Sequence, residues 1–205
     1  MKTSDLRTMQ DEPESDAGAR TPRVIAVGCP SSGWEMVLPA LQQGGLKPAG
    51  DDFKRWHDEL FQKAGVADPL QVRQPMQPAP PMAERTVGML AQASTPLLLA
   101  DSRSLWLLDF WARQLPQARF LLFYTHPETA MALALMQGMG AQFLDGWQAA
   151  NKQLLKFQRQ HRQRALLLDA QPACAHPQAL VDACQRIGLA LQIPRPSPDP
   201  KPVLP

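Results

Sequence analysis

The segment from Arg23 to Trp34 constrains the fold more than any other part of the chain. It reads Arg-Val-Ile-Ala-Val-Gly-Cys-Pro-Ser-Ser-Gly-Trp: a short apolar run ends at Gly28, and a helix is expected to begin at Gly33. A strand, a glycine-bounded loop and a helix form the geometry of a phosphate-binding loop, in which backbone N–H groups face an anion. The Lys-Ser/Thr pair that usually follows the second glycine is absent, and Trp34 and Glu35 stand in its place. The segment therefore keeps the form of an anion site without its charge.

Composition places the chain among soluble proteins with one folded domain. Its 205 residues suffice for a sizeable core, and 21 basic against 19 acidic residues give a net charge of +2. This balance argues against bulk nucleic-acid binding and electrostatic membrane attachment. No apolar stretch approaches the ~20 residues of a membrane span, and the first residues lack a signal-peptide core. The three cysteines, Cys29, Cys174 and Cys184, show no metal-ligand spacing, so we predict a cytoplasmic protein without a metal site.

Polarity and proline divide the chain into three parts. Residues 1–21 are polar and without periodicity, which predicts a disordered segment. Six prolines fall within residues 194–205 and predict a Pro-rich tail without regular structure. The folded α/β domain is expected over residues 22–193, with a long loop where five prolines occur between Pro69 and Pro81.

Short apolar runs alternate with amphipathic helical patterns across this domain. The predicted strands are Val24–Val27, Leu97–Ala100, Phe120–Tyr124, Ala165–Leu168 and a short fifth at Ala190–Ile193. The predicted helices cover residues 33–43, 53–64, 83–93, 103–114, 127–137, 142–162 and 177–187. The runs are apolar throughout rather than alternating, which is typical of parallel strands covered on both faces. We therefore predict a three-layer α/β sandwich with a central parallel sheet of four to five strands.

Four segments, in consistent order, resemble the sulfotransferase family, whose members use 3′-phosphoadenosine-5′-phosphosulfate (PAPS) as sulfuryl donor. They are the loop Gly28–Gly33, the stretch from Ala100 to Trp111, the run Leu115 to Pro127 that contains Leu-Pro-Gln-Ala-Arg-Phe, and the stretch from Trp147 to Leu189. The resemblance covers about residues 23 to 193. It implies the P-loop-like sulfotransferase fold and, in an active member, sulfuryl transfer from PAPS to a hydroxyl acceptor.

The resemblance also implies which residues would contact the donor. Ser31, Ser32 and Gly33 would face the phosphosulfate, Arg103 would add a cation at a helix start, and Thr125 would lie at the 3′-phosphate. The family has a basic residue at the position of Ser31 and an Arg at that of Thr125. It has a hydroxyl where this chain has Trp34, and a Ser in the helix that follows Thr125, where this chain has Ala132. The donor-binding motifs are therefore degenerate.

Two candidate residues, His57 and Arg103, each have a functional and a structural interpretation. His57 is the best candidate for a catalytic base, because it follows the first helix on the side where an acceptor would approach; its alternative is a solvated helix face. Arg103 could hold a sulfate, or it could form a salt bridge with Asp101 or Glu35.

Two functions follow from these patterns. The favoured hypothesis is a non-catalytic binding or scaffolding protein that meets a protein, a glycan or a small molecule and needs no cofactor. The alternative is an active PAPS-dependent sulfotransferase. A nucleotide kinase is disfavoured because the Lys-Ser/Thr pair and a clear metal-binding Asp are missing.

Overall fold

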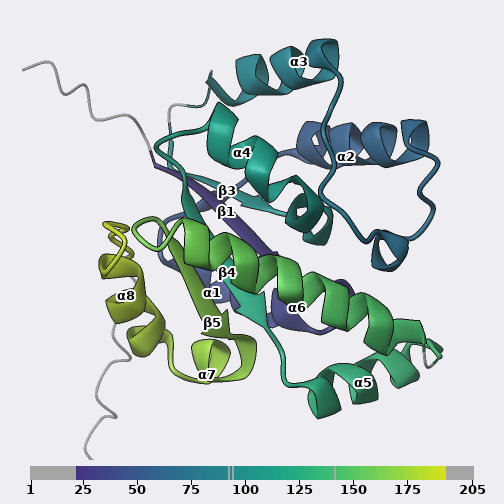
Figure 1. Ribbon diagram of the computed structural model, residues 1–205. Helices are drawn as coiled ribbons and strands as arrows, with labels where there is room; N and C mark the ends of the chain where they lie inside the picture. The colour runs from purple at the N-terminus through teal and green to yellow at the C-terminus, as the bar shows by residue number, and fades with distance from the viewer. Residues whose placement is uncertain (1–21, 92, 94, 141, 193–205) are drawn as a thin grey trace, which may run out of the picture.

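Five parallel strands form the centre of the molecule (Figure 1). The computed structural model describes residues 22–192 apart from 92, 94 and 141, so the predicted segments 1–21 and 194–205 lie outside the described residues. The strands are β1 (Arg23–Gly28), β2 (Lys47–Pro48), β3 (Leu97–Ala100), β4 (Arg119–Tyr124) and β5 (Ala165–Asp169). Their order in the sheet is β2-β3-β1-β4-β5, which puts β1 in the middle, and the parallel α/β prediction is confirmed.

Helices connect the strands and cover both sides of the sheet (Figure 1). The α-helices are α1 (Leu38–Gln43), α2 (Asp51–Lys63), α3 (Pro80–Ala91), α4 (Leu108–Gln114), α5 (Pro127–Met136), α6 (Gln142–Gln160), α7 (Ala170–Ala175) and α8 (Pro177–Gln185). Three short 3-10 helices complete the set: η1 (Trp34–Val37), η2 (Pro69–Gln71) and η3 (Ser102–Leu107). None of the described helices is long and apolar enough to cross a membrane.

The apolar runs predict the layers because successive side chains of a strand point to opposite faces. Ile25 and Val27 of β1 are buried in one core cluster, together with residues of α2, α4 and α6. Val24 and Ala26 are buried in a second cluster, with residues of η1, α1 and α8. A central strand must therefore be apolar at every position, which is the pattern that the sequence carries.

The structure corrects the position of the fifth strand. Residues 190–192 form no strand, and residue 193 lies outside the described part. Leu191 is buried, and the Gln192 backbone N–H donates to the carbonyl of Gly44 rather than to a sheet edge. The fifth strand is instead β2, which pairs with β3 and contains no apolar run from which it could be predicted. The predicted loop from Pro69 to Pro81 holds η2 and the start of α3.

His57 lies in the core, so the prediction of a solvated helix face is wrong. Its Nδ1 is 3.0 Å from the Phe53 carbonyl oxygen, which can only accept, so Nδ1 carries the proton. Its Nε2 then accepts from the Ser104 hydroxyl at 2.9 Å, and Ser104 Oγ accepts from the Trp111 indole N–H at 3.2 Å. Asp101 Oδ2 stands 3.8 Å from Nδ1. The neutral ring is a buried hydrogen-bonding group that joins α2 to η3.

Acid should destabilise the protein through this ring. Burial lowers the pKa of His57 to about 4 from its ordinary 6.5, against an opposing effect of Asp101. Between these pH values the unfolded chain binds the proton and the folded chain does not, so stability is full above pH 6.5 and falls as the pH drops toward 4. We expect a loss of about 2 kcal/mol between pH 7 and pH 5 from this group alone.

Urea unfolding at the two pH values measures this loss. His57→Gln should show a smaller pH dependence than the unchanged protein, and His126→Gln, at an exposed position, should not. Equal pH dependence of the protein and of His57→Gln would contradict the assignment.

Candidate functional site

The loop between β1 and η1, residues 28–33, is the segment that the resemblance expects to face the sulfuryl donor, and it is named the donor loop. Ser31 and Gly33 both adopt left-handed backbone conformations, with φ of 59° and 79°. The Ser32 backbone N–H donates to the Cys29 carbonyl at 3.3 Å, and Gly33 precedes the first residue of η1. The predicted strand–loop–helix geometry is therefore present, with the helix divided into η1 and α1.

Trp34 covers the base of the donor loop. Its indole is buried and lies nearly parallel to the Phe123 ring, with 5.9 Å between the ring centroids and 12° between the planes. A methyl group on Gly28 would come within 2.4 Å of Trp34 Cγ, so the indole rests directly on the backbone where β1 ends. The resemblance predicts a hydroxyl at this position, and the structure places a large apolar ring there.

The polar edge of this indole is hydrogen-bonded to η3, the 3-10 helix that follows β3. Trp34 Nε1 donates to Ser102 Oγ at 2.8 Å, and Ser102 Oγ donates to Glu35 Oε1 at 3.1 Å. Burial raises the pKa of Glu35, while hydrogen bonds from its own backbone N–H and from Ser102 oppose that rise. A carboxylate of the protein itself thus occupies the start of η1, where an incoming anion would meet like charge.

The hydroxyls of Ser32 in the donor loop and of Thr125 after β4 are bonded inside the protein. Ser32 is fully buried, and its Oγ donates to the Cys29 carbonyl at 2.8 Å. Thr125 is also buried, its Oγ1 donates to Ser32 Oγ at 3.4 Å, and its carbonyl accepts from Trp147 Nε1 at 3.2 Å. The structure therefore brings Ser32 and Thr125 together at the ends of β1 and β4, while Ser31 remains half-buried.

Arg103 forms ion pairs on both sides. Its Nη2 lies 2.8 Å from Asp101 Oδ2, its Nε donates to Asp101 Oδ1 at 3.0 Å, and its Nη1 pairs with Asp58 of α2. Burial tends to raise the pKa of the Asp101 carboxyl, but the Arg103 guanidinium outweighs it and holds that pKa below its ordinary value. Of the salt bridges considered above, the one to Asp101 is present. Two carboxylates neutralise this cation before any ligand arrives.

Burial limits the reactivity of the two remaining candidate side chains, Cys29 and His57. Burial raises the pKa of the Cys29 thiol to about 12, so it stays protonated and is a poor nucleophile. His57 has no exposed surface. In the part of the chain that the structure describes, no three His, Cys, Asp or Glu side chains lie together as a metal-binding group.

Sequence reasoning missed Ser102 and Asp58 as partners in this site. Ser102 is 68 residues from Trp34, and the two meet because β1 and β3 are adjacent and parallel, so their carboxyl ends share one edge of the sheet. The expected pairing of β1 with β3 could therefore have predicted that Ser102 lies near Trp34. The sequence contains no comparable signal for Asp58, because the contact of Asp58 with Arg103 depends on how α2 packs against η3.

Comparison with known proteins identifies the fold. No protein-family model matches the sequence, and the search of curated proteins finds no similar sequence. The solved structures that match the chain include two sulfotransferases with TM-scores above 0.5.

The sulfotransferase domain of the Synechococcus PCC 7002 olefin synthase matches with a TM-score of 0.60 and 16% identity, over 84% of this chain and 74% of that one. A sulfotransferase from Alicyclobacillus acidocaldarius matches with a TM-score of 0.53 and 12% identity, over 87% of each chain. The chain therefore has a sulfotransferase-like α/β fold.

Proposed function

We propose that this chain is a sulfotransferase-like domain with a degenerate donor site, which binds or scaffolds a partner instead of transferring sulfuryl groups from PAPS. The observation that carries the proposal is the Trp34 indole, which lies on Gly28 and donates to Ser102. It supports the proposal because a phosphate needs space above the backbone of the donor loop. The buried indole fills that space, and moving it away would cost its apolar contacts and its hydrogen bond.

The charges of the site support the same conclusion. A family-type site would place a cation at Ser31 and an Arg at Thr125, and each charge-assisted contact contributes about 1.5–3 kcal/mol. The loss of two such contacts weakens a micromolar site to about the millimolar range or beyond. Arg103 does not compensate, since Asp101 and Asp58 already pair with it.

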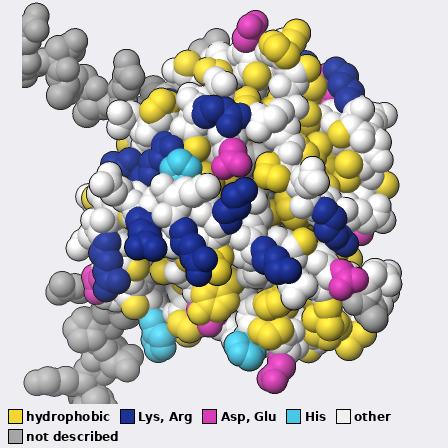
Figure 2. Space-filling model, in the orientation of Figure 1, with side chains coloured by type: hydrophobic (Ala, Val, Ile, Leu, Met, Phe, Trp, Pro, Cys, Tyr) yellow, Lys and Arg dark blue, Asp and Glu magenta, His cyan; other side chains and the backbone are white. Residues whose placement is uncertain are grey.

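Exposed apolar side chains support the partner-binding part of the proposal. Leu135 and Met136 at the end of α5 are 59% and 84% exposed, and Leu144 near the start of α6 is 43% exposed. Hydrophobic side chains gather over this lower part of the molecule in Figure 2. Large apolar side chains grouped on a surface are typical of contact with another protein.

Calorimetry with adenosine 3′,5′-bisphosphate, the spent form of PAPS, tests the proposal. The unchanged protein should show no saturable binding below about millimolar concentration, because neither Ser31 nor Thr125 supplies a cation to pair with a phosphate. Low-micromolar affinity would contradict the proposal and favour the active sulfotransferase.

A double variant tests whether charge is what the donor loop lacks. Ser31→Lys with Glu35→Gln adds a cation and removes a carboxylate at the loop, so affinity for the same nucleotide should rise at least about tenfold. Thr125 is left unchanged because it is buried against Ser32.

Gln117→Lys with Glu84→Gln is the matched control for this variant. It makes the same change in net charge at exposed positions away from the donor loop, and it should leave affinity unchanged. If the control raised affinity as much as the loop variant, the gain would reflect net charge rather than the loop.

A further inference from the structure

A groove of about 520 Å³ lies where α6 ends and β5 begins, and four of the residues that line it are arginines. Arg119 is the first residue of β4, Arg159 lies in the last turn of α6, and Arg162 and Arg164 follow that helix. The other lining residues that the structure describes are His161, two glutamines and a proline, so no carboxylate faces this arginine groove. The groove lies at the edge of the sheet where the strands begin, opposite the donor loop.

Two of the arginines hold the walls of the groove in place. Arg164 donates to the carbonyl of Pro116 at 2.8 Å and to that of Ala112 in α4 at 3.1 Å. Arg119 donates through Nε to the carbonyl of Ile187, just after α8. Carbonyls at the end of a helix carry partial negative charge, so both guanidiniums are anchored there. The shape of the groove therefore does not depend on a bound molecule.

The other two arginines have no partner among the described residues. Arg159 and Arg162 are exposed, and neither forms a hydrogen bond or an ion pair with a residue that the structure describes. Positive charges also crowd one another here: burial lowers the pKa of Arg164, and the neighbouring Arg119 guanidinium lowers it further. Crowded cations attract an anion to the surface that carries them.

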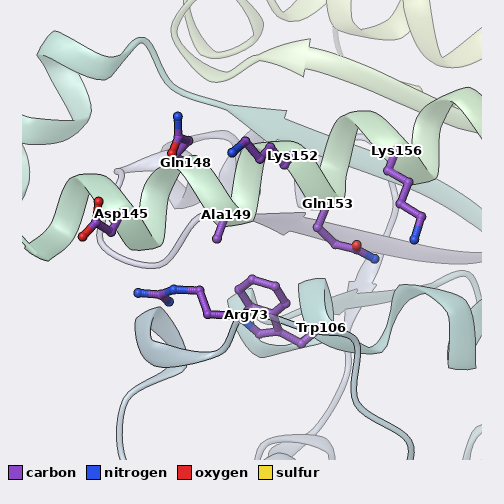
Figure 3. A pocket seen from close by; sticks show the side chains of 8 residues that line it. All are labelled: Arg73, Trp106, Asp145, Gln148, Ala149, Lys152, Gln153 and Lys156. Atoms are coloured by element: carbon purple, nitrogen blue, oxygen red, sulfur yellow. The ribbon is translucent and has the colours of Figure 1, made fainter.

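Helix α6 extends this positive surface. Lys152 and Lys156 project from the two turns before Arg159, whereas Asp145, the acidic residue of α6, lies at the other end of the helix (Figure 3). A cation near the end of a helix complements its dipole, which accounts for Arg159. It does not account for Arg162, which lies beyond the helix, or for a lining without carboxylates.

The chain carries an acidic segment of matching charge shortly before β1. Four of its six residues are carboxylates, and no Lys or Arg occurs from Thr8 to Ala19. The four carboxylates are Asp11, Glu12, Glu14 and Asp16. Six peptide steps connect Asp16 to Pro22, so an extended chain spans up to about 20 Å between them.

The topology of the sheet attaches this segment beside the arginine groove. Pro22 adjoins β1, and its carbonyl accepts from the Leu97 backbone N–H at 3.1 Å. Val24 of β1 is the register partner of Arg119 in β4, so the backbones of Pro22 and Arg119 lie about 8 Å apart. A tether of about 20 Å therefore reaches the groove. So short a tether gives an effective concentration in the millimolar range, at which weak ion pairs suffice.

We propose that the acidic segment Asp11–Asp16 docks on the arginine groove of its own chain. Its carboxylates pair with Arg159 and Arg162, whose planar guanidiniums match a carboxylate with two parallel hydrogen bonds. Such pairs form between side chains, so the segment needs neither a helix nor a strand, in keeping with its polar, aperiodic sequence. The docked segment neutralises the groove and keeps other acidic chains away from it.

Nuclear magnetic resonance on the ¹⁵N-labelled full chain tests the contact. Arg159→Gln with Arg162→Gln should shift the amide signals of Glu12 and Glu14, and about 0.5 M salt should shift those of the unchanged protein in the same direction. Both arginines are exposed, so the strand signals should stay in place and report an intact fold.

Lys54→Gln with Arg55→Gln is the matched control for this variant. It removes two exposed cations of α2 that do not line the groove, and it should leave the signals of the acidic segment unchanged. An equal shift in the control would assign the effect to net charge and overturn the proposal. The absence of a shift in the groove variant would overturn it as well.

Binding of poly-L-glutamate to the full chain tests whether the groove is occupied. Neutralising the four carboxylates of the acidic segment to Asn or Gln should raise the affinity for this probe at least about tenfold, because the arginines are then free. The control neutralises four exposed carboxylates outside the groove and should raise the affinity less than about threefold. These four are Asp51, Asp52, Glu84 and Glu128.

Two further results separate the other occupants of the groove. Equal affinity of the unchanged and neutralised chains for poly-L-glutamate would mean that the groove is open to an external acidic partner, which overturns the proposal. Segment signals that move toward their high-salt positions on about tenfold dilution would assign the contact to a second copy of the chain, which also overturns it. Nucleotide binding at the donor loop leaves all of these expectations unchanged.

Discussion

The contact between the Trp34 indole and the end of β1 determines what the rest of the site can do. The indole lies on the Gly28 backbone, stacks on Phe123 of β4 and donates to Ser102 after β3. One side chain thereby links the carboxyl ends of the three central strands. In related folds this edge of the sheet is where ligands bind, because the loops there are free of strand pairing. Here the edge is filled by the protein's own side chains.

The neighbouring polar groups are consistent with that closure. Ser102 donates to Glu35 at the surface, Thr125 and Ser32 form a buried pair, and Arg103 is neutralised by Asp101. Each pair engages polar groups that would otherwise be free to contact a ligand. Restoring a ligand site would therefore require more than one substitution, since each new charge must also displace an existing partner.

The architecture was predictable because the sheet is parallel and buried on both faces. Uninterrupted apolar runs identified β1, β3, β4 and β5, and the glycines fixed the donor loop. The sequence did not reveal β2, whose two residues depend on β3 for their pairing, nor the burial of His57. A histidine among polar neighbours on a helix resembles a surface residue until the packing of α2 against η3 is known. The partners of Trp34 and Arg103 likewise depend on which elements meet in space.

If Trp34 keeps the donor loop closed, its indole N–H signal in an NMR spectrum reports on this directly. In a ¹⁵N-labelled sample this signal is assigned as the one that Trp34→Phe removes, and it is followed while adenosine 3′,5′-bisphosphate is added. The signal should stay unchanged up to about millimolar nucleotide, because the N–H remains bonded to Ser102. A shift that saturates at low-micromolar nucleotide would contradict it, because the indole would then yield to a bound ligand.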